Sequence, residues 1–87
     1  MNAELLLQYA AGVVAGRRAR YGDSLALFGQ IAARWSLVLG IEVTPSQVAL
    51  CLIDLKIARL THDPTHLDSI VDVAGYAALL REVTHHG

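Results

Sequence analysis

The stretch from Lys56 to Tyr76 carries the side chains whose types and spacing could do chemistry. Two cations, Lys56 and Arg59, lie one helical turn apart near the end of an apolar segment. Two carboxylates, Asp68 and Asp72, lie one turn apart near the start of the next apolar segment. A turn containing proline separates the two segments, so a helical hairpin would bring the four charges together. The spacing predicts either a structural cluster of ion pairs or a site for a phosphate-bearing ligand.

The two cations repel each other unless an anion lies between them. That anion could be a ligand phosphate, to which Arg59 offers a planar fork and Lys56 a point charge. It could equally be Asp68 or Asp72. Both cations also lie in the last turns of their expected helix, where the helix dipole favours positive charge. The residues themselves leave both interpretations open.

The two carboxylates have different local explanations. With Thr65, Asp68 fits the pattern T-x-x-D of a helix amino end, and there a capping role is sufficient. Asp72 falls inside the helix among apolar residues, and we expect it at the surface, either paired with one of the cations or binding Mg²⁺. Asp54 on the preceding helix could complete a magnesium site with Asp68 and Asp72.

Glycine and tyrosine residues add to this set. Gly75 lies inside a helix, where glycine costs about 1 kcal/mol relative to alanine and is tolerated where a backbone or a ligand comes close. Tyr76 could hold its ring in the core and its hydroxyl at a polar site. Upstream, Arg17 and Tyr21 could reach a shared polar pocket, although a solvated helix end explains Arg17 equally well. The residues that could contact a phosphate-bearing ligand are Lys56, Arg59, Arg17, Tyr21 and Tyr76.

The elements that must position these residues are four helices, over about 3–20, 24–39, 44–60 and 65–83. Gly22 and Gly40 end the first two, and Thr44 with Gln47 forms a capping box before the third. The third helix is apolar almost all round and is expected to be central. Gly12 and Gly16 weaken the first helix or permit a close helix crossing. Short connections favour antiparallel neighbours, and no segment indicates a sheet, so we predict an all-α four-helix domain.

Length and composition bound the remaining possibilities. The 87 residues make a single domain, 1–87, that is 54% hydrophobic, and the mean hydropathy is +0.43. A chain of this size buries only about 60–65% of its unfolded surface, so excess apolar content indicates burial against another subunit. We therefore expect a homo-oligomer.

Charge and cysteine usage exclude several classes of protein. The formal net charge of -1 gives no general attraction to nucleic acid, and the chain lacks an apolar run that could span a membrane. The leucines near the amino end follow no basic segment, so we expect no signal peptide. The lone Cys51 excludes an intramolecular disulfide. These features are typical of a cytoplasmic protein.

Several strings together resemble a family of small phage and prophage proteins of unknown function. The resemblance runs from about Arg17 to Leu80. It is carried by Arg17…Tyr21-Gly22-Asp23, by Leu55-Lys56-Ile57-Ala58-Arg59-Leu60 and by Asp68-Ser69…Asp72-Val73-Ala74-Gly75-Tyr76-Ala77. Similar strings occur in phage domains associated with nucleotide modification. Those domains are in turn distantly similar to the all-α nucleoside triphosphate pyrophosphohydrolases of the MazG and dUTPase type.

The resemblance implies a role in phage nucleotide metabolism, in the cytoplasm of a bacterial host, with a MazG-like helical arrangement as one form of the fold. The first hypothesis is a protein that binds a nucleotide or a nucleotide-derived signal, and that could sequester a host signalling nucleotide. The second is a Mg²⁺-dependent pyrophosphohydrolase that uses Asp54, Asp68 and Asp72. The third is a non-catalytic helical interaction module. MazG-type enzymes carry E-E-x-x-E and E-x-x-D motifs, which these helices lack, so the sequence leaves open whether any reaction is catalysed.

Overall fold

The computed structural model describes residues 1–85, and within that range the chain folds into four α-helices with no strand. The helices are α1 (Ala3–Tyr21), α2 (Ser24–Leu39), α3 (Pro45–His62) and α4 (Leu67–Thr84). The prediction of an all-α domain is confirmed. None of these helices is long and apolar enough to cross a membrane.

Local sequence explains most of the helix ends. The side chain of Asp23 accepts a hydrogen bond from the backbone of Ala26 at the start of α2. Thr44 and Gln47 form the predicted capping box at the start of α3. The chain leaves α1 through Gly22 at φ 84° and leaves α2 through Gly40 at φ 70°, in a region of backbone conformation that favours glycine.

The predicted capping box of α4 is wrong. His66, not Thr65, caps this helix, and its Nδ1 accepts a hydrogen bond from the backbone N–H of Ser69 at 3.3 Å. Thr65 donates instead to the carboxylate of Asp63, through both its hydroxyl and its backbone N–H. Asp68 therefore lies in the first turn without closing a box, where it still meets the helix dipole favourably.

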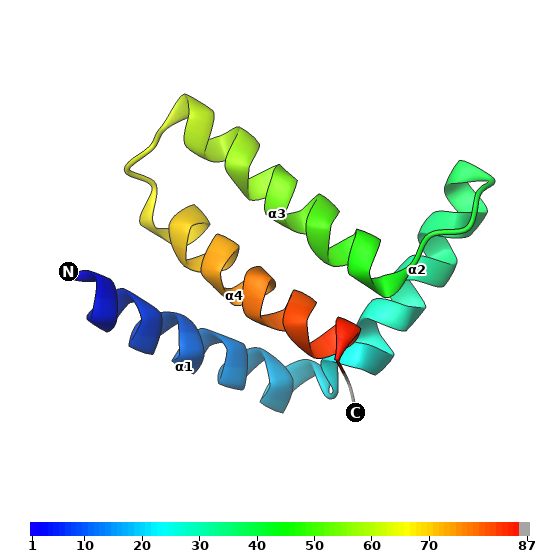
Figure 1. The fold of residues 1–87 in the computed structure, drawn as a ribbon, viewed down its shortest axis with the longest axis horizontal. Helices are drawn as coiled ribbons and strands as arrows, with labels where there is room; N and C mark the ends of the chain where they lie inside the picture. The colour runs from blue at the N-terminus through cyan, green and yellow to red at the C-terminus, as the bar shows by residue number, and fades with distance from the viewer. Residues whose placement is uncertain (86–87) are drawn as a thin grey trace.

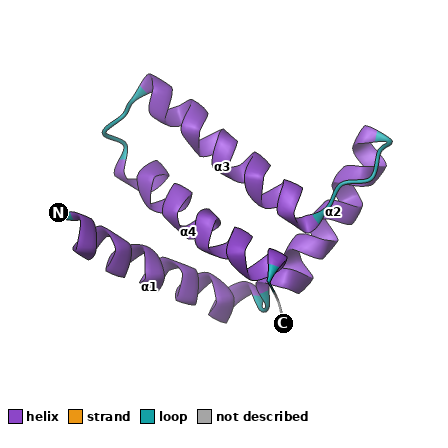
Figure 2. Ribbon diagram, in the orientation of Figure 1, coloured by secondary structure: helices purple, strands orange, loops and turns teal. Residues whose placement is uncertain are grey.

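Helix α4 lies between α1 and α3, and α2 crosses one end of the molecule (Figure 1). The hairpin of α3 and α4 is antiparallel, as expected, and the connections between helices are short loops (Figure 2). In contrast, α1 and α4 run in the same direction, and α1 and α2 diverge after their short turn (Figure 1). The expectation that all neighbours are antiparallel is thus wrong for α1, which packs against the last helix instead of the next one.

The central helix is α4, and the prediction that α3 is central is wrong. Six residues of α4 are buried, against two in α3. The apolar residues of α3 surround the whole helix, but only one side of it meets α2 and α4, so Leu50, Leu55 and Ile57 remain exposed. One cluster of buried apolar residues contains Phe28, Ala32, Val48, Ala49, Leu79 and Val83.

Helix α1 packs closely against α4 at Gly75. A Cβ atom at this position would lie 3.3 Å from Cγ2 of Val14, so the absence of a side chain lets α1 pack there. The interpretation of Gly75 as a residue of close helix packing is confirmed. Gly12 and Gly16 have no heavy atom within 4 Å of a built Cβ, so the predicted close crossing does not involve them.

Candidate functional site

Asp72 is buried at the centre of the charged cluster and binds two cations from two other helices. Its Oδ1 accepts a hydrogen bond from Nη2 of Arg17 at 2.9 Å, and its Oδ2 lies 3.0 Å from Nζ of Lys56. The Asp72 side chain is 5% exposed, whereas Lys56 is 13% and Arg17 37% exposed. The expectation that Asp72 lies at the surface is wrong. We call Arg17, Lys56 and Asp72 the ion triad.

The triad joins three helices, because Arg17 comes from α1, Lys56 from α3 and Asp72 from α4. A carboxylate this deeply buried is stable only when opposite charges and hydrogen bonds satisfy it. One cation neutralises the carboxylate, and the second leaves the triad with a formal surplus of one positive charge. Arg17 is the more exposed of the two cations and hence the one that solvent or a ligand can reach.

Tyr76 holds the other side of the Arg17 side chain. The guanidinium carbon lies 5.1 Å from the centroid of the Tyr76 ring, within the range of a cation–π contact. Burial alone would lower the pKa of Arg17, but the interactions with Tyr76 and the charge of Asp72 outweigh it and raise the pKa above its usual value. The charge of Asp68 adds in the same direction. Arg17 is therefore a permanent cation with a fixed position.

A cavity of about 380 Å³ lies directly beside Arg17 and Tyr76. Its wall is mostly apolar, and the polar groups come from the end of α1, the start of α2 and the middle of α4. Tyr21 and Arg18 are exposed residues of this wall. The lining residues are Val14, Arg17, Arg18, Tyr21, Gly22, Ser24, Leu27, Phe28, Ile31, Leu52, Tyr76 and Leu79. We call this space the α1–α2 cavity.

Two polar residues of the cavity were missed by sequence reasoning. Arg18 donates to both carboxylate oxygens of Glu82 on α4, at 2.8 and 2.6 Å, and so is held beside Arg17. Ser24 is buried at the first position of α2. The basic run around Arg18 was the one signal for its role, and nothing in the sequence around Ser24 distinguishes it from an ordinary helix start.

The other predicted site residues do not join the triad. Arg59 is exposed and lies instead beside a surface hollow of about 310 Å³ with His62, Asp63 and His66. Asp68 is exposed, and it acts on Arg17 only through its charge. The structure thus joins Lys56 and Asp72 to Arg17, and Arg17 shares a cavity wall with Tyr21 and Tyr76. Arg59 lies outside this set.

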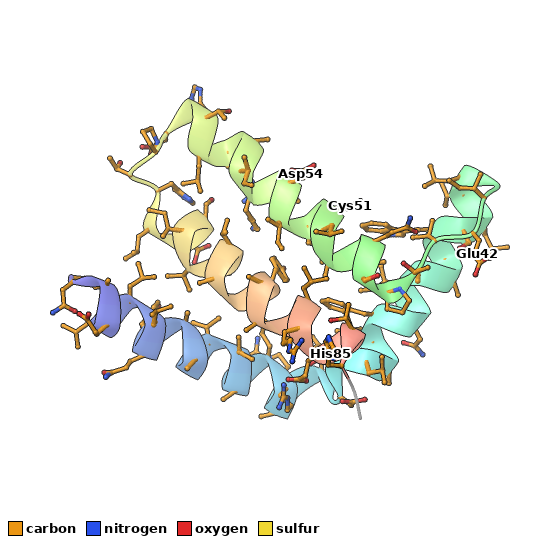
Figure 3. The ribbon with its side chains drawn as sticks, viewed as in Figure 1. Glu42, Cys51, Asp54 and His85 are labelled. Carbon is orange, nitrogen blue, oxygen red and sulfur yellow. The ribbon has the colours of Figure 1, made fainter. Side chains whose placement is uncertain are left out.

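The three carboxylates predicted as magnesium ligands do not form one group. Asp54 is exposed on α3 and points away from α4 (Figure 3), whereas Asp72 is buried between α1, α3 and α4. Across residues 1–85, no three side chains of His, Cys, Asp or Glu come together in a way that could hold a metal ion. Both oxygens of Asp72 already face cations of the same chain.

The fold and the site define a small all-α protein with a buried ion triad beside a largely apolar cavity. Residues 5–84 match the family described as Domain of unknown function (DUF6378), and the chain belongs to that family. No solved structure matches the chain.

Two curated relatives are phage proteins. The Gene 55 protein of Mycobacterium phage L5 is 40% identical over 80 residues, which are 90% of this chain and 51% of that protein. The Gene 55 protein of Mycobacterium phage D29 is 34% identical over 82 residues, which are 93% of this chain and 54% of that protein. The chain spans about half the length of these relatives. The resemblance to a phage protein family of unknown function is confirmed, and the more distant likeness to MazG-type enzymes stays a prediction.

Proposed function

We propose that this protein binds a nucleotide or another phosphate-bearing small molecule in the α1–α2 cavity. The observation that carries the proposal is the position of Arg17, a fixed cation on the cavity wall between Asp72 and Tyr76. Because Lys56 already neutralises Asp72, the charge of Arg17 remains available to an anion in the cavity. The guanidinium fork suits a phosphate, which it can contact with two parallel hydrogen bonds.

The cavity suits the rest of such a ligand as well. Its volume of about 380 Å³ falls at the lower end of the range for small-molecule sites. Its wall is mainly apolar, and Tyr21 and Tyr76 offer aromatic rings on which a nucleobase can stack, at about 1–3 kcal/mol per base. The phage origin of the relatives agrees with a ligand from the nucleotide pool of an infected bacterium, and hence with a cytoplasmic protein.

The proposal differs from the sequence-based prediction in the cations that it uses. Arg17 and Arg18 line the cavity and contact the ligand, whereas Lys56 acts indirectly by balancing Asp72. Arg59 has no part in the site, because it is exposed beside a separate hollow.

We do not extend the proposal to metal-dependent hydrolysis of the ligand. A magnesium ion would have to displace Lys56 or Arg17 from Asp72, and Asp54 faces away from α4. Binding without bond cleavage needs only the cations, the aromatic rings and the apolar wall.

Isothermal titration calorimetry with nucleoside mono-, di- and triphosphates, cyclic dinucleotides and inorganic phosphate tests the proposal. For the nucleotide that binds the wild-type protein best, Arg17→Ala is expected to weaken binding about tenfold or more, the equivalent of about 1.4 kcal/mol. Arg17→Lys keeps the charge but not the fork and should show an intermediate loss.

Arg59→Ala is the matched control, because it removes an arginine of the same chain that lies outside the cavity. Its affinity should equal that of the wild type. The proposal fails if none of these probes binds the wild-type protein, or if Arg59→Ala weakens binding as much as Arg17→Ala.

A further inference from the structure

The carboxyl end of α2 presents a continuous apolar surface to solvent. Leu37 and Val38 are 83% and 82% exposed, and Leu39 and Ile41 are 61% and 64% exposed. The buried residues of α2 are Ser24, Phe28 and Ala32, so none lies in its last seven positions. We call Leu37, Val38, Leu39 and Ile41 the α2-end patch.

This end of α2 projects from the rest of the bundle. Figure 1 shows the last turns of α2 and the loop to α3 extending beyond the start of α3. The loop is not loose, since the backbone N–H of Val43 donates to Oγ of Ser36 at 2.9 Å, and this oxygen also donates to the carbonyl of Ala32 at 2.7 Å. The patch is therefore held in a fixed shape while its side chains lack a partner within the described chain.

The total exposed area agrees with a missing partner. A compact monomer of 9.4 kDa is expected to expose roughly 5,000 Å². This chain exposes 5901 Å², an excess of about 900 Å² over that expectation. One partner in a standard-size protein interface contributes about 800 Å², so the excess matches one side of such an interface.

The charges around the patch favour a second copy of the same chain as the partner. Arg34 lies one helical turn before Leu37, and Glu42 directly follows Ile41 in the loop at the edge of the molecule (Figure 3). Both are exposed, and neither takes part in an ion pair within residues 1–85. Arg34 precedes the patch in sequence and Glu42 follows it, so each copy in a two-fold dimer would offer one cation and one anion that can pair across the interface.

We infer that the protein forms a two-fold symmetric dimer through the α2-end patch, with Arg34 of each copy facing Glu42 of the other. The dimer buries the four apolar side chains against their equivalents and pairs two charges that the single chain leaves unpaired. Because the patch is formed by the end of α2 and the α1–α2 cavity by the start of α2, dimer formation and ligand binding are separable.

Sedimentation velocity over a series of protein concentrations tests this inference with the full chain. The wild type should sediment as a dimer that dissociates on dilution, and Leu37→Lys should sediment as a monomer. Leu7→Lys is the matched control, because Leu7 is an exposed leucine on α1, away from the patch, and it should leave the dimer intact. Circular dichroism should show the same helix content in all three proteins, since neither leucine is buried.

Charge reversal tests whether the partner at the α2-end patch is a second copy of this chain or a different molecule. Arg34→Glu and Glu42→Arg should each weaken the dimer roughly tenfold or more, because like charges then face each other. The combined variant restores opposite charges and should recover the dimer. A wild type that is monomeric at every concentration, a dimer that survives Leu37→Lys, or a combined variant without recovery would each overturn the inference.

Discussion

Nζ of Lys56 on α3 lies 3.0 Å from Oδ2 of Asp72 on α4, and this is the most buried ion pair within residues 1–85. The pair does two things at once. It fixes the two helices of the α3–α4 hairpin against each other, and it shares the charge of a carboxylate that Arg17 would otherwise have to balance alone. The stability of the ion triad and the ability of Arg17 to contact an anion in the α1–α2 cavity therefore both depend on the contact between Lys56 and Asp72.

Removing Lys56 should destabilise the fold more than removing an exposed partner of a salt bridge. Lys56→Met leaves the buried Asp72 with Arg17 alone, and we expect a loss of about 2 kcal/mol in the free energy of unfolding. The double variant Lys56→Met/Asp72→Leu should recover part of this loss, since no buried carboxylate remains. Urea unfolding followed by circular dichroism measures both.

Arg18→Ala provides the comparison, because the pair of Arg18 and Glu82 is exposed on both sides. Exposed pairs contribute about 0–1 kcal/mol. Equal losses in Lys56→Met and Arg18→Ala would show that burial of the triad adds nothing to stability.

Replacement by alanine should affect stability differently at two glycines inside helices, Gly12 and Gly75. Gly12→Ala meets no atom within 4 Å and should stabilise the protein by about 0.5–1 kcal/mol through helix propensity. Gly75→Ala gains the same propensity, but its Cβ would lie 3.3 Å from Cγ2 of Val14 and press α1 away from α4. We therefore expect Gly75→Ala to show no increase in the temperature of thermal unfolding. The double variant Gly75→Ala/Val14→Ala should not raise that temperature either, because Val14 packs against the core. A full gain in Gly75→Ala would contradict the close approach of the two helices.

The cap of α4 should depend on an acceptor at position 66. His66→Ala removes the acceptor for the backbone N–H of Ser69 and should cost about 1 kcal/mol. His66→Asn supplies a side-chain oxygen that is among the best caps, and should retain most of the stability. Thr65→Ala tests the alternative cap directly: a cap at Thr65 would hold the backbone N–H of Asp68, so the amide of Asp68 should exchange its hydrogen as in the wild type. His66→Ala should instead expose the amide of Ser69.

Asp63 should make the α3–α4 turn sensitive to acid. The side-chain hydrogen bond from Thr65, followed by the one from its backbone N–H, lowers the pKa of Asp63 below its usual 3.8. Because the folded-state pKa is the lower one, the carboxylate stabilises the turn at pH above about 3.8. That contribution is lost as the pH falls through the folded-state pKa.

An NMR titration of the Asp63 carboxyl group measures this effect. Thr65→Val removes the hydroxyl donor but keeps the backbone N–H, so the pKa of Asp63 should rise part of the way toward its usual value. An unchanged pKa in Thr65→Val would mean that the backbone N–H alone is responsible.

Sequence reasoning succeeded where the determining contacts are local. The helix over 24–39 and the capping box of Thr44 and Gln47 follow from residues within a few positions of each other, and both are confirmed. The pairing of Lys56 with Asp72 was one of two open alternatives, and it follows from the antiparallel hairpin. Thr65 is a reasonable cap by residue type, but its hydroxyl donates to Asp63, and His66 caps the helix instead.

The missed relationships depend on tertiary packing. Arg17 reaches Asp72 across 55 positions of sequence, and no local pattern shows that α1 packs on α4 and not on α2. Arg59 was expected to act with Lys56, three residues before it. Three residues rotate an α-helix by about 300°, so the Arg59 side chain leaves the helix about 60° away from the direction of Lys56. At the edge of an interface that rotation is enough to turn a side chain into solvent.

The parallel pairing of the first and last helices has a consequence for the order of assembly. The two long-range ion pairs of α1, from Arg17 to Asp72 and from Arg18 to Glu82, both end on α4. Among the four helices α1 precedes α4 in the chain by the greatest distance, yet it packs mainly on α4. The hairpin of α3 and α4 can form from contacts close in sequence, whereas α1 must close a much longer loop. Of the four helices, α1 therefore depends most on contacts distant in sequence, and the wall of the α1–α2 cavity is complete only once α1 has docked.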